Sequence, residues 1–146
     1  MKTRYLAVFA LVAAFAAHSL SAADKAEVEL KCPVSGKAVN KDSSVEFNGG
    51  KVYFCCDNCP AAFEKDSKKF AAKANHQMVI SGELVQFACP YTGKDVNPET
   101  IIDIDGAKVG FCCNGCKGKT EKATPEKQLE MVFTDTTKGF KAAEKK

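Results

Sequence analysis

Eight cysteines dominate the reactive side chains of this 146-residue chain. Six of them form two groups with one spacing, C-x22-C-x3-C: Cys32, Cys55 and Cys59 in the first group, and Cys89, Cys112 and Cys116 in the second. The other two, Cys56 and Cys113, directly follow the second cysteine of each group. Thiolates bind soft and borderline metal ions, whereas paired thiols form disulfides in oxidising compartments. Both chemistries are therefore open to this chain.

The cysteine spacing belongs to a tandem duplication. Residues 32–59 align without a gap with residues 89–116, and 13 of the 28 positions are identical at a constant offset of 57. We therefore expect two copies of one unit, at 28–80 and 84–134. Units of about 50 residues are marginal on an apolar core alone, and a metal ion or disulfides usually add the missing stability.

A turn and a hairpin must position the first cysteines of each group. Pro33 and Gly36 predict a tight turn over 32–37. Short strand-like runs at 44–47 and 51–54 flank Asn48-Gly49-Gly50, which is a strong hairpin signal. The turn cysteine and the end of the second strand are thereby joined through one hairpin.

A helix start positions the remaining cysteines. Helical segments are expected at 61–65 and from Ser67, so Cys55 and Cys59 stand four residues apart where a helix begins and can face the same way. A helix N-terminus also favours the thiolate, the form that binds metal. A turn cysteine plus a helix-start pair, bridged by a hairpin, is how a treble-clef metal site is assembled.

The second unit repeats this order. Strands are expected at 100–104 and 108–111, and a helix start at Thr124-Pro125-Glu126. Three more strand-like runs stand at 77–80, 84–88 and 131–134; the first two predict a hairpin that links the units. Residues 135–146 read as a solvated polar tail. The fold class expected is α+β, with two small treble-clef-like units. Phe54, Phe63, Phe70 and Phe111 are expected in the core.

The two units resemble tandem YHS-type domains of the TRASH-like family of treble-clef metal-binding modules. The matching stretches are Cys32-Pro33, Gly36-Lys37, Val52 to Cys55, Cys59, Phe63 and Phe70, and then Cys89-Pro90, Gly93-Lys94, Phe111-Cys112, Cys116 and Pro125 to Lys127. The resemblance implies heavy-metal trafficking, resistance or sensing, with Cys32, Cys55, Cys59, Cys89, Cys112 and Cys116 as ligands.

The turn departs from that family's pattern. Many relatives have a second cysteine where this chain has Ser35 and Thr92, so Cys56 and Cys113 become candidate additional ligands. Structural zinc is almost always four-coordinate, while three thiolates with an open position suit a soft ion such as Cu(I). The expected cofactor is therefore zinc or copper.

Two other functions compete with metal binding. An even number of cysteines in a small exported protein is typical of a disulfide-stapled structural or interaction module, although the adjacent cysteines are awkward partners for one another. A thiol redox protein built on Cys56-x-x-Cys59 is disfavoured, because the βαβ context of such motifs is missing. His76, which has no counterpart in the second unit, is expected to be solvated.

The first 23 residues predict a secretory signal peptide. Lys2 and Arg4 precede an apolar run over 5–17, and Ser21-Ala22-Ala23 supplies small residues at a cleavage site. The run is too short for a membrane span, which needs about 20 residues. We therefore expect a periplasmic or secreted protein with no membrane association after cleavage.

The composition after residue 23 argues against several function classes. It holds 19 lysines, no arginine and 18 acidic residues. Because arginine is preferred for phosphate and guanine contacts, no nucleic-acid partner is expected. No Ser-His-Asp set and no glycine-rich phosphate loop after a strand is found, so no enzyme activity is predicted.

Overall fold

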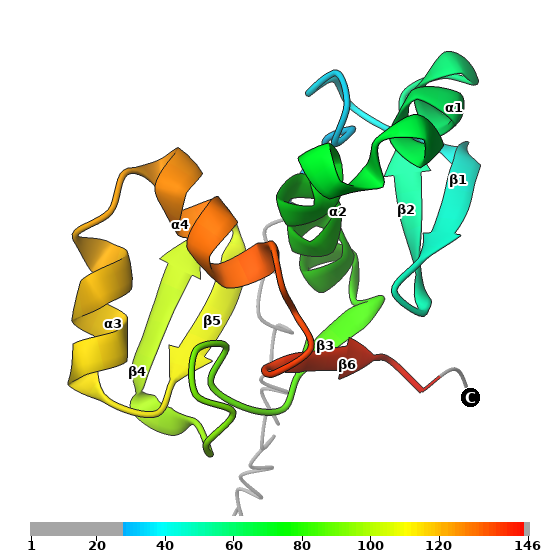
Figure 1. The fold of residues 1–146 in the computed structure, drawn as a ribbon. Helices are drawn as coiled ribbons and strands as arrows, with labels where there is room; N and C mark the ends of the chain where they lie inside the picture. Colours follow the sequence, from blue (N-terminus) through cyan, green and yellow to red (C-terminus); the bar gives the residue numbers. More distant parts are fainter. Residues whose placement is uncertain (1–27, 145–146) are drawn as a thin grey trace, which may run out of the picture.

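The computed structural model describes residues 28–144, and over that range the chain is an α+β fold of four helices and three two-stranded antiparallel sheets (Figure 1). In chain order its elements are β1 (Asn40–Phe47), β2 (Gly50–Phe54), α1 (Asn58–Lys65), α2 (Ser67–Ser81), β3 (Leu84–Gln86), β4 (Asn97–Ile104), β5 (Ala107–Phe111), α3 (Asn114–Glu121), α4 (Pro125–Phe133) and β6 (Phe140–Ala142). The predicted signal peptide, residues 1–23, lies outside the described residues.

Both predicted hairpins are confirmed. Strands β1 and β2 pair through a two-residue loop at Asn48 and Gly49, and β4 and β5 through one at Asp105 and Gly106. All four loop residues have positive φ (49°, 80°, 47° and 88°), as tight hairpin turns with right-handed strand twist require. The Asn-Gly and Asp-Gly pairs tolerate this backbone, so the turn is encoded locally.

Helices replace two of the predicted strands. The run 77–80 lies in the last turn of α2. Asp66 caps the start of this helix by accepting from the Lys69 amide, and Gly82, with φ 81°, is its C-cap. The run 131–134 forms the end of α4, which begins at Pro125 as expected, and the C-cap Thr134. Short apolar runs carry no reliable period, and here packing between the helices overrides their β-propensity.

The segment expected as a polar tail instead joins the two repeats. Strand β6 pairs with β3 in the register Leu84↔Ala142, Val85↔Lys141 and Gln86↔Phe140, and the Phe140 side chain is 4% exposed. The predicted linking hairpin is therefore wrong: β3 pairs with β6, not with 77–80.

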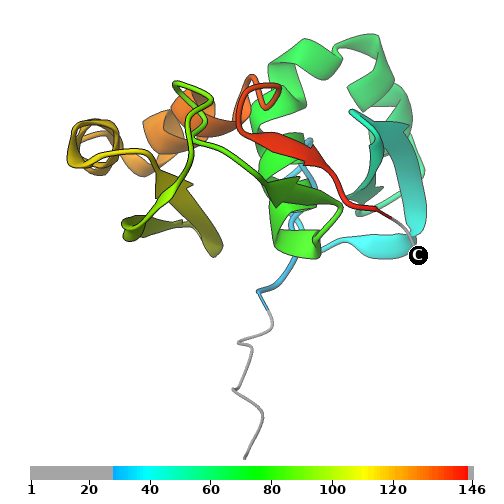
Figure 2. The same ribbon diagram turned by 90° about the horizontal axis from the view of Figure 1, so that it is seen from below.

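Equivalent elements of the two repeats pair with each other. Strand β3 lies at the start of the predicted unit 84–134, but it follows α2 as β6 follows α4 and therefore counts with the first repeat; the two strands pair antiparallel, while α2 packs on α4. In Figures 1 and 2 the β3–β6 pair lies between the hairpin β1–β2 and the hairpin β4–β5. This is the self-complementary pattern of a symmetric dimer, here within one chain.

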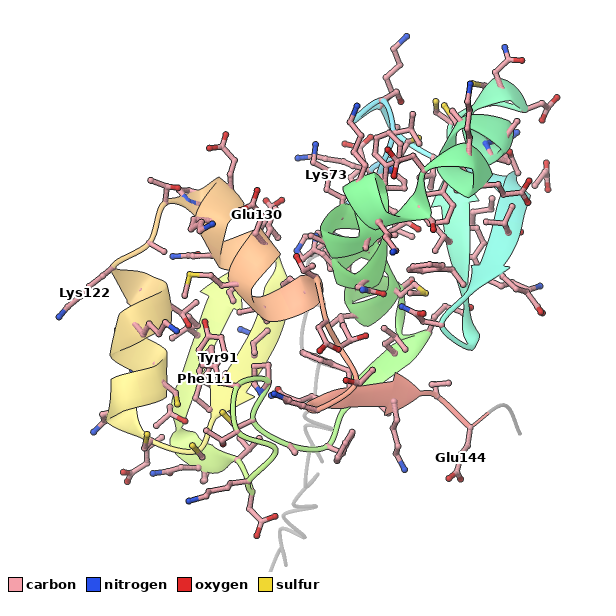
Figure 3. All side chains as sticks on the ribbon, in the orientation of Figure 1. Lys73, Tyr91, Phe111, Lys122, Glu130 and Glu144 are labelled. Atoms are coloured by element: carbon pink, nitrogen blue, oxygen red, sulfur yellow. The ribbon has the colours of Figure 1, made fainter. Side chains whose placement is uncertain are left out.

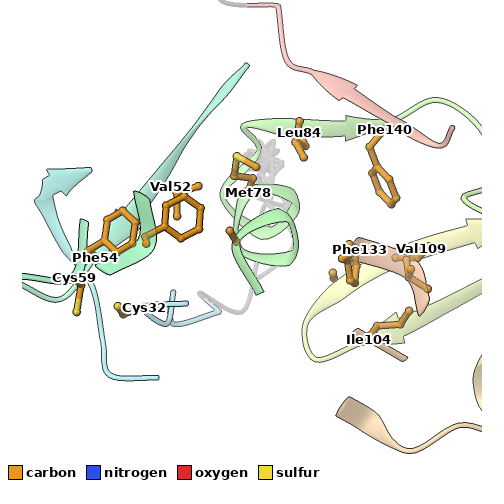
Figure 4. Close-up of a cluster of buried hydrophobic side chains, with 14 of the residues drawn as sticks. Cys32, Val52, Phe54, Cys59, Met78, Leu84, Ile104, Val109, Phe133 and Phe140 are labelled. Atoms are coloured by element: carbon orange, nitrogen blue, oxygen red, sulfur yellow. The ribbon is translucent and has the colours of Figure 1, made fainter. Parts of the chain in front are cut away.

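One apolar core runs through both repeats. Figure 4 shows Phe54 and Val52 on one side of α2, and Phe133, Val109 and Ile104 on the other. Phe54, Phe63 and Phe111 are buried as predicted, and Phe70 is partly buried against the same cluster. Because the core is shared, each repeat depends on its partner for burial.

His76 is buried in this interface, and the expectation of a solvated side chain is wrong. Its Nε2 lies 2.9 Å from the Ile104 carbonyl oxygen of β4, and its ring centroid lies 5.1 Å from that of Phe133 on α4. Burial lowers its pKa below 6.5, although Asp105 and Asp103 act in the opposite direction. A neutral imidazole therefore links α2 to the second repeat.

Between residues 28 and 144, no helix combines the length and the apolar character needed to cross a membrane.

Candidate metal centres

The turn that carries the first cysteine of each group has the same backbone geometry in both repeats. The Cys32 amide donates to the Lys37 carbonyl at 2.7 Å, and the Gly36 amide donates to the Cys32 carbonyl at 2.8 Å. Cys89 repeats both bonds, at 2.8 Å each. Gly36 has φ 73°, a conformation that glycine adopts at no steric cost. The predicted turn is thereby confirmed.

The three sulfur atoms of the first group lie together. The Sγ atoms of Cys32, Cys55 and Cys59 are all within 4.8 Å of one another, and those of Cys55 and Cys59 are 3.6 Å apart. Strand β2 leads into Cys55, and Cys59 is the second residue of α1. Three sulfurs around one ion at about 2.3 Å each need separations of this order.

The second repeat reproduces the cluster. The Sγ atoms of Cys89, Cys112 and Cys116 are again within 4.8 Å of one another, with Cys112 and Cys116 3.8 Å apart. Figure 3 shows sulfur atoms near the start of α1 and near the start of α3, at opposite ends of the molecule. The chain therefore holds two separate cysteine groups that are each close enough for a metal ion.

The turn favours a thiolate at its cysteine. Burial acts to raise the pKa of Cys32, which is 1% exposed, but the Ser35 hydroxyl and the amides of neighbouring residues donate to its sulfur and lower the pKa to about 7. The same balance, with the Thr92 hydroxyl as donor, lowers the pKa of Cys89 to about 6. Turn hydrogen bonds therefore prepare one negative charge in each cluster.

The helix cysteines hold their protons more strongly. Burial, followed by the hydrogen bonds from Cys56 and Cys55, raises the pKa of Cys59 to about 12. Burial and the corresponding neighbours raise the pKa of Cys116 to about 12. Three thiolates do not coexist in such a small volume without a cation, so binding of a metal ion would release protons from these thiols.

Two hydroxyl side chains of the turns, Ser35 and Thr92, contact the clusters. The Ser35 hydroxyl lies 3.1 Å from the Cys55 sulfur, and the Thr92 hydroxyl donates to the Cys112 sulfur at 3.3 Å. Each hydroxyl also accepts from the backbone amide two residues later. Each hydroxyl thereby ties the turn to the cysteine that follows the second strand of the hairpin.

Cys56 and Cys113 are exposed and stand outside the two mutually close groups. The Asn58 amide and the neighbouring thiols lower the pKa of Cys56, and the Cys116 amide leads the same effect on the pKa of Cys113. The Cys56 sulfur is nevertheless only 3.5 Å from that of Cys59. Both side chains therefore lie at the edge of a cluster, on its solvent side.

A glutamine side chain ties the turn to the strand in each repeat, and the sequence did not reveal it. In the first repeat the Gln77 amide group donates to the carbonyls of Lys31 and Tyr53 and accepts from the Tyr53 amide, at 2.7–2.8 Å. Lys31 precedes the turn cysteine, and Tyr53 lies two residues before Cys55. We call this arrangement the glutamine clamp.

The second repeat has the same clamp from another element. Gln86 donates to the carbonyls of Ala88 and Gly110 and accepts from the Gly110 amide, at 2.6–2.9 Å. Ala88 and Gly110 are the positions equivalent to Lys31 and Tyr53. Because Gln77 is on α2 and Gln86 is on β3, the two glutamines do not align, and no repeat comparison could have paired them.

Comparison with known proteins finds no matching family model, no similar curated protein and no similar solved structure for this chain. The function therefore has to be argued from the two cysteine clusters.

Proposed function

We propose that each repeat binds one soft or borderline metal ion, zinc or copper, through its three clustered cysteines. The observation that carries the proposal is the recurrence of one sulfur cluster: two groups of three, each with its ligand atoms within 4.8 Å, built on the same turn, hairpin and helix start. Thiolates select zinc and Cu(I) over the hard cations, which prefer oxygen ligands.

The donor set discriminates between these two ions. Cu(I) accepts three thiolates, which is the number that each close group supplies. A structural zinc site needs a fourth ligand, which here would be water or the exposed Cys56 and Cys113. The hydroxyls of Ser35 and Thr92 already contact sulfur. We therefore place Cu(I) first and zinc second.

The wider proposal is a role in heavy-metal handling by an exported protein of the YHS/TRASH-like type. It rests on the order of turn, hairpin and helices around the cysteines and on the sequence features of residues 1–23. In an oxidising compartment, a bound ion would keep the thiols from pairing, because the ionised sulfurs are already engaged.

Metal analysis of protein purified from the exported fraction tests this function. We expect two ions per chain and eight free thiols after denaturation in a chelator, one ion for each cluster. The Cys32→Ser variant is expected to retain one ion, and the Cys32→Ser/Cys89→Ser variant none. Metal-free protein without free thiols would instead establish the disulfide-stapled module, since each bridge lowers the mass by two hydrogens.

A further inference from the structure

A second three-sulfur set overlaps the first repeat's cluster. The Sγ atoms of Cys55, Cys56 and Cys59 are 3.5, 3.6 and 3.7 Å apart in their three pairs. Cys55 and Cys59 also belong to the cluster with Cys32. The first repeat thus offers two triangles of sulfur that share the edge Cys55–Cys59. We call them the inner set, completed by Cys32, and the outer set, completed by Cys56.

The two sets differ in their access to solvent. Cys32 is 1% exposed and Cys59 is 8% exposed, Cys55 is intermediate, and Cys56 is exposed. The sulfurs therefore form a gradient from the core to the surface. An ion held by the inner set is shielded from solvent on the side of the turn, while an ion held by the outer set can be reached by an external ligand.

The second repeat reproduces two of these three sulfur contacts. The Cys112 sulfur lies 3.8 Å from that of Cys116 and 3.9 Å from that of Cys113, and Cys113 is again the exposed member. Cys89 completes the inner set there. The recurrence of this geometry argues that the adjacent cysteine belongs to the site.

Resting on the metal binding proposed above, we propose that Cys56 and Cys113 are exchange ligands, which take the ion from the inner set and present it to a soft ligand from solvent. In the exchange the Cys56 sulfur, losing its proton to water, bonds to the ion while the bond from Cys32 breaks. Cys32 then takes up a proton from water or remains ionised in the hydrogen bonds of its turn. The ion keeps three sulfur ligands throughout, and no oxidation is involved.

The geometry favours exchange over a permanent fourth ligand. The mutually close group takes in Cys32 and leaves out Cys56 in the first repeat, and Cys113 in the second. A tetrahedral site would need all four sulfurs at similar mutual distances. Two triangles with one shared edge suit instead an ion that moves from one face to the other.

The test uses the full chain, reduced and loaded anaerobically with Cu(I), as wild type and as the Cys56→Ser/Cys113→Ser variant. The readouts are the copper stoichiometry, the equilibrium affinity against a chromogenic Cu(I) chelator, and the rate of copper transfer to excess chelator in stopped flow. We expect two ions and an affinity within about threefold of the wild type, but transfer at least about tenfold slower, because an intramolecular ligand no longer precedes the external one.

The matched control is Asp57→Ser/Asn114→Ser, which places serine at the exposed neighbours of Cys56 and Cys113. It should transfer copper at the wild-type rate. An unchanged rate in the cysteine variant would overturn the exchange role. A loss of affinity of tenfold or more, on the order of 1.4 kcal/mol, would show that the two cysteines are permanent ligands. A wild-type chain that binds neither copper nor zinc would overturn the proposed function itself, and this inference with it; a chain that binds zinc but no copper would overturn this inference alone.

Discussion

In the first repeat the ring of Phe63 on α1 is buried in the same core cluster as Cys32 and Cys59, whereas α3 of the second repeat has Thr120 at the equivalent position. Phe63 packs with ring centroids 5.1 Å from Phe47 and 5.4 Å from Phe54. The turn of this repeat carries the smaller Val34, which is partly buried against the core.

The second repeat exchanges these sizes. Its turn carries Tyr91 in place of Val34, and the Tyr91 ring lies 5.6 Å from Phe111 (Figure 3), while its hydroxyl is 2.7 Å from the Thr120 hydroxyl. The aromatic ring thus comes from the turn in one repeat and from the helix in the other. The core must be densely packed, but the residue that supplies the aromatic ring is free to differ. The two copies therefore hold the same sulfur geometry on different cores.

The glutamine clamps follow the same rule for polar contacts: the contact recurs in both copies, but the element that supplies it differs. Gln77 reaches the turn and strand from α2, and Gln86 reaches them from β3. What the copies share is the set of backbone groups that must be satisfied beside the cysteines. The side chain that satisfies them comes from a helix in one copy and from a strand in the other.

The largest expected difference between neighbouring positions concerns Cys55 and Cys56. Cys55 belongs to the inner set, so Cys55→Ser should abolish metal binding in the first repeat, whereas Cys56→Ser should retain the ion at equilibrium. Metal content after gel filtration, with the second repeat as internal reference, measures both. Equal losses would indicate a four-thiolate site, and the reverse order would contradict our assignment.

Removing the ring behind the first cluster should cost more than removing its counterpart. We expect Phe63→Ala to lower the free energy of unfolding by about 3–5 kcal/mol, the usual cost of truncating a buried phenylalanine. Thr120→Ala should cost about 1 kcal/mol, mainly through its hydrogen bond to Tyr91. Urea denaturation followed by circular dichroism compares them; equal losses would refute the size exchange between the repeats.

Loss of one glutamine clamp should weaken the metal site of one repeat only. Gln77→Leu leaves backbone groups at Lys31 and Tyr53 without their side-chain partner, so we expect a loss of about 1–3 kcal/mol in stability. It should also weaken metal binding in the first repeat while leaving the second unchanged. Competitive titration of single-site variants reads this out, with Gln86→Leu as the reciprocal case. Weakening of both sites by either variant would mean that the clamp acts through global stability.

The smallest effect expected is a pH dependence of the free energy of unfolding, which arises from His76 at the interface between the repeats. The pKa of His76 is lowered in the folded chain, so the unfolded chain takes up a proton first as the pH falls below 6.5. The stabilisation is therefore complete above this pH and is lost as the pH falls toward the folded pKa. Denaturation at several pH values should show this slope, and His76→Gln should flatten it. The same slope in the variant would assign it to carboxylates.

Local sequence determined the parts of this protein whose partners are close along the chain. Pro33 and Gly36, and Pro90 and Gly93 in the second repeat, specify the cysteine turns. Loop residues that tolerate positive φ specify both hairpins. The cysteine clusters follow from these elements, since the turn, the strand end and the helix start lie within one short unit. For such elements the residues that specify the conformation are also the ones that adopt it.

Only the tertiary structure decided how the two copies are joined. The runs 77–80 and 131–134 became helical, Phe140 entered the core with β6, and His76 was buried, because each of these contacts lies on the far repeat. The Gln86 clamp has the same origin, because β3 follows α2 of the first repeat, whereas the Gln77 clamp lies within one repeat. A local pattern records the face that a residue presents but not the surface that will cover it, and here that surface is a second copy of the same unit.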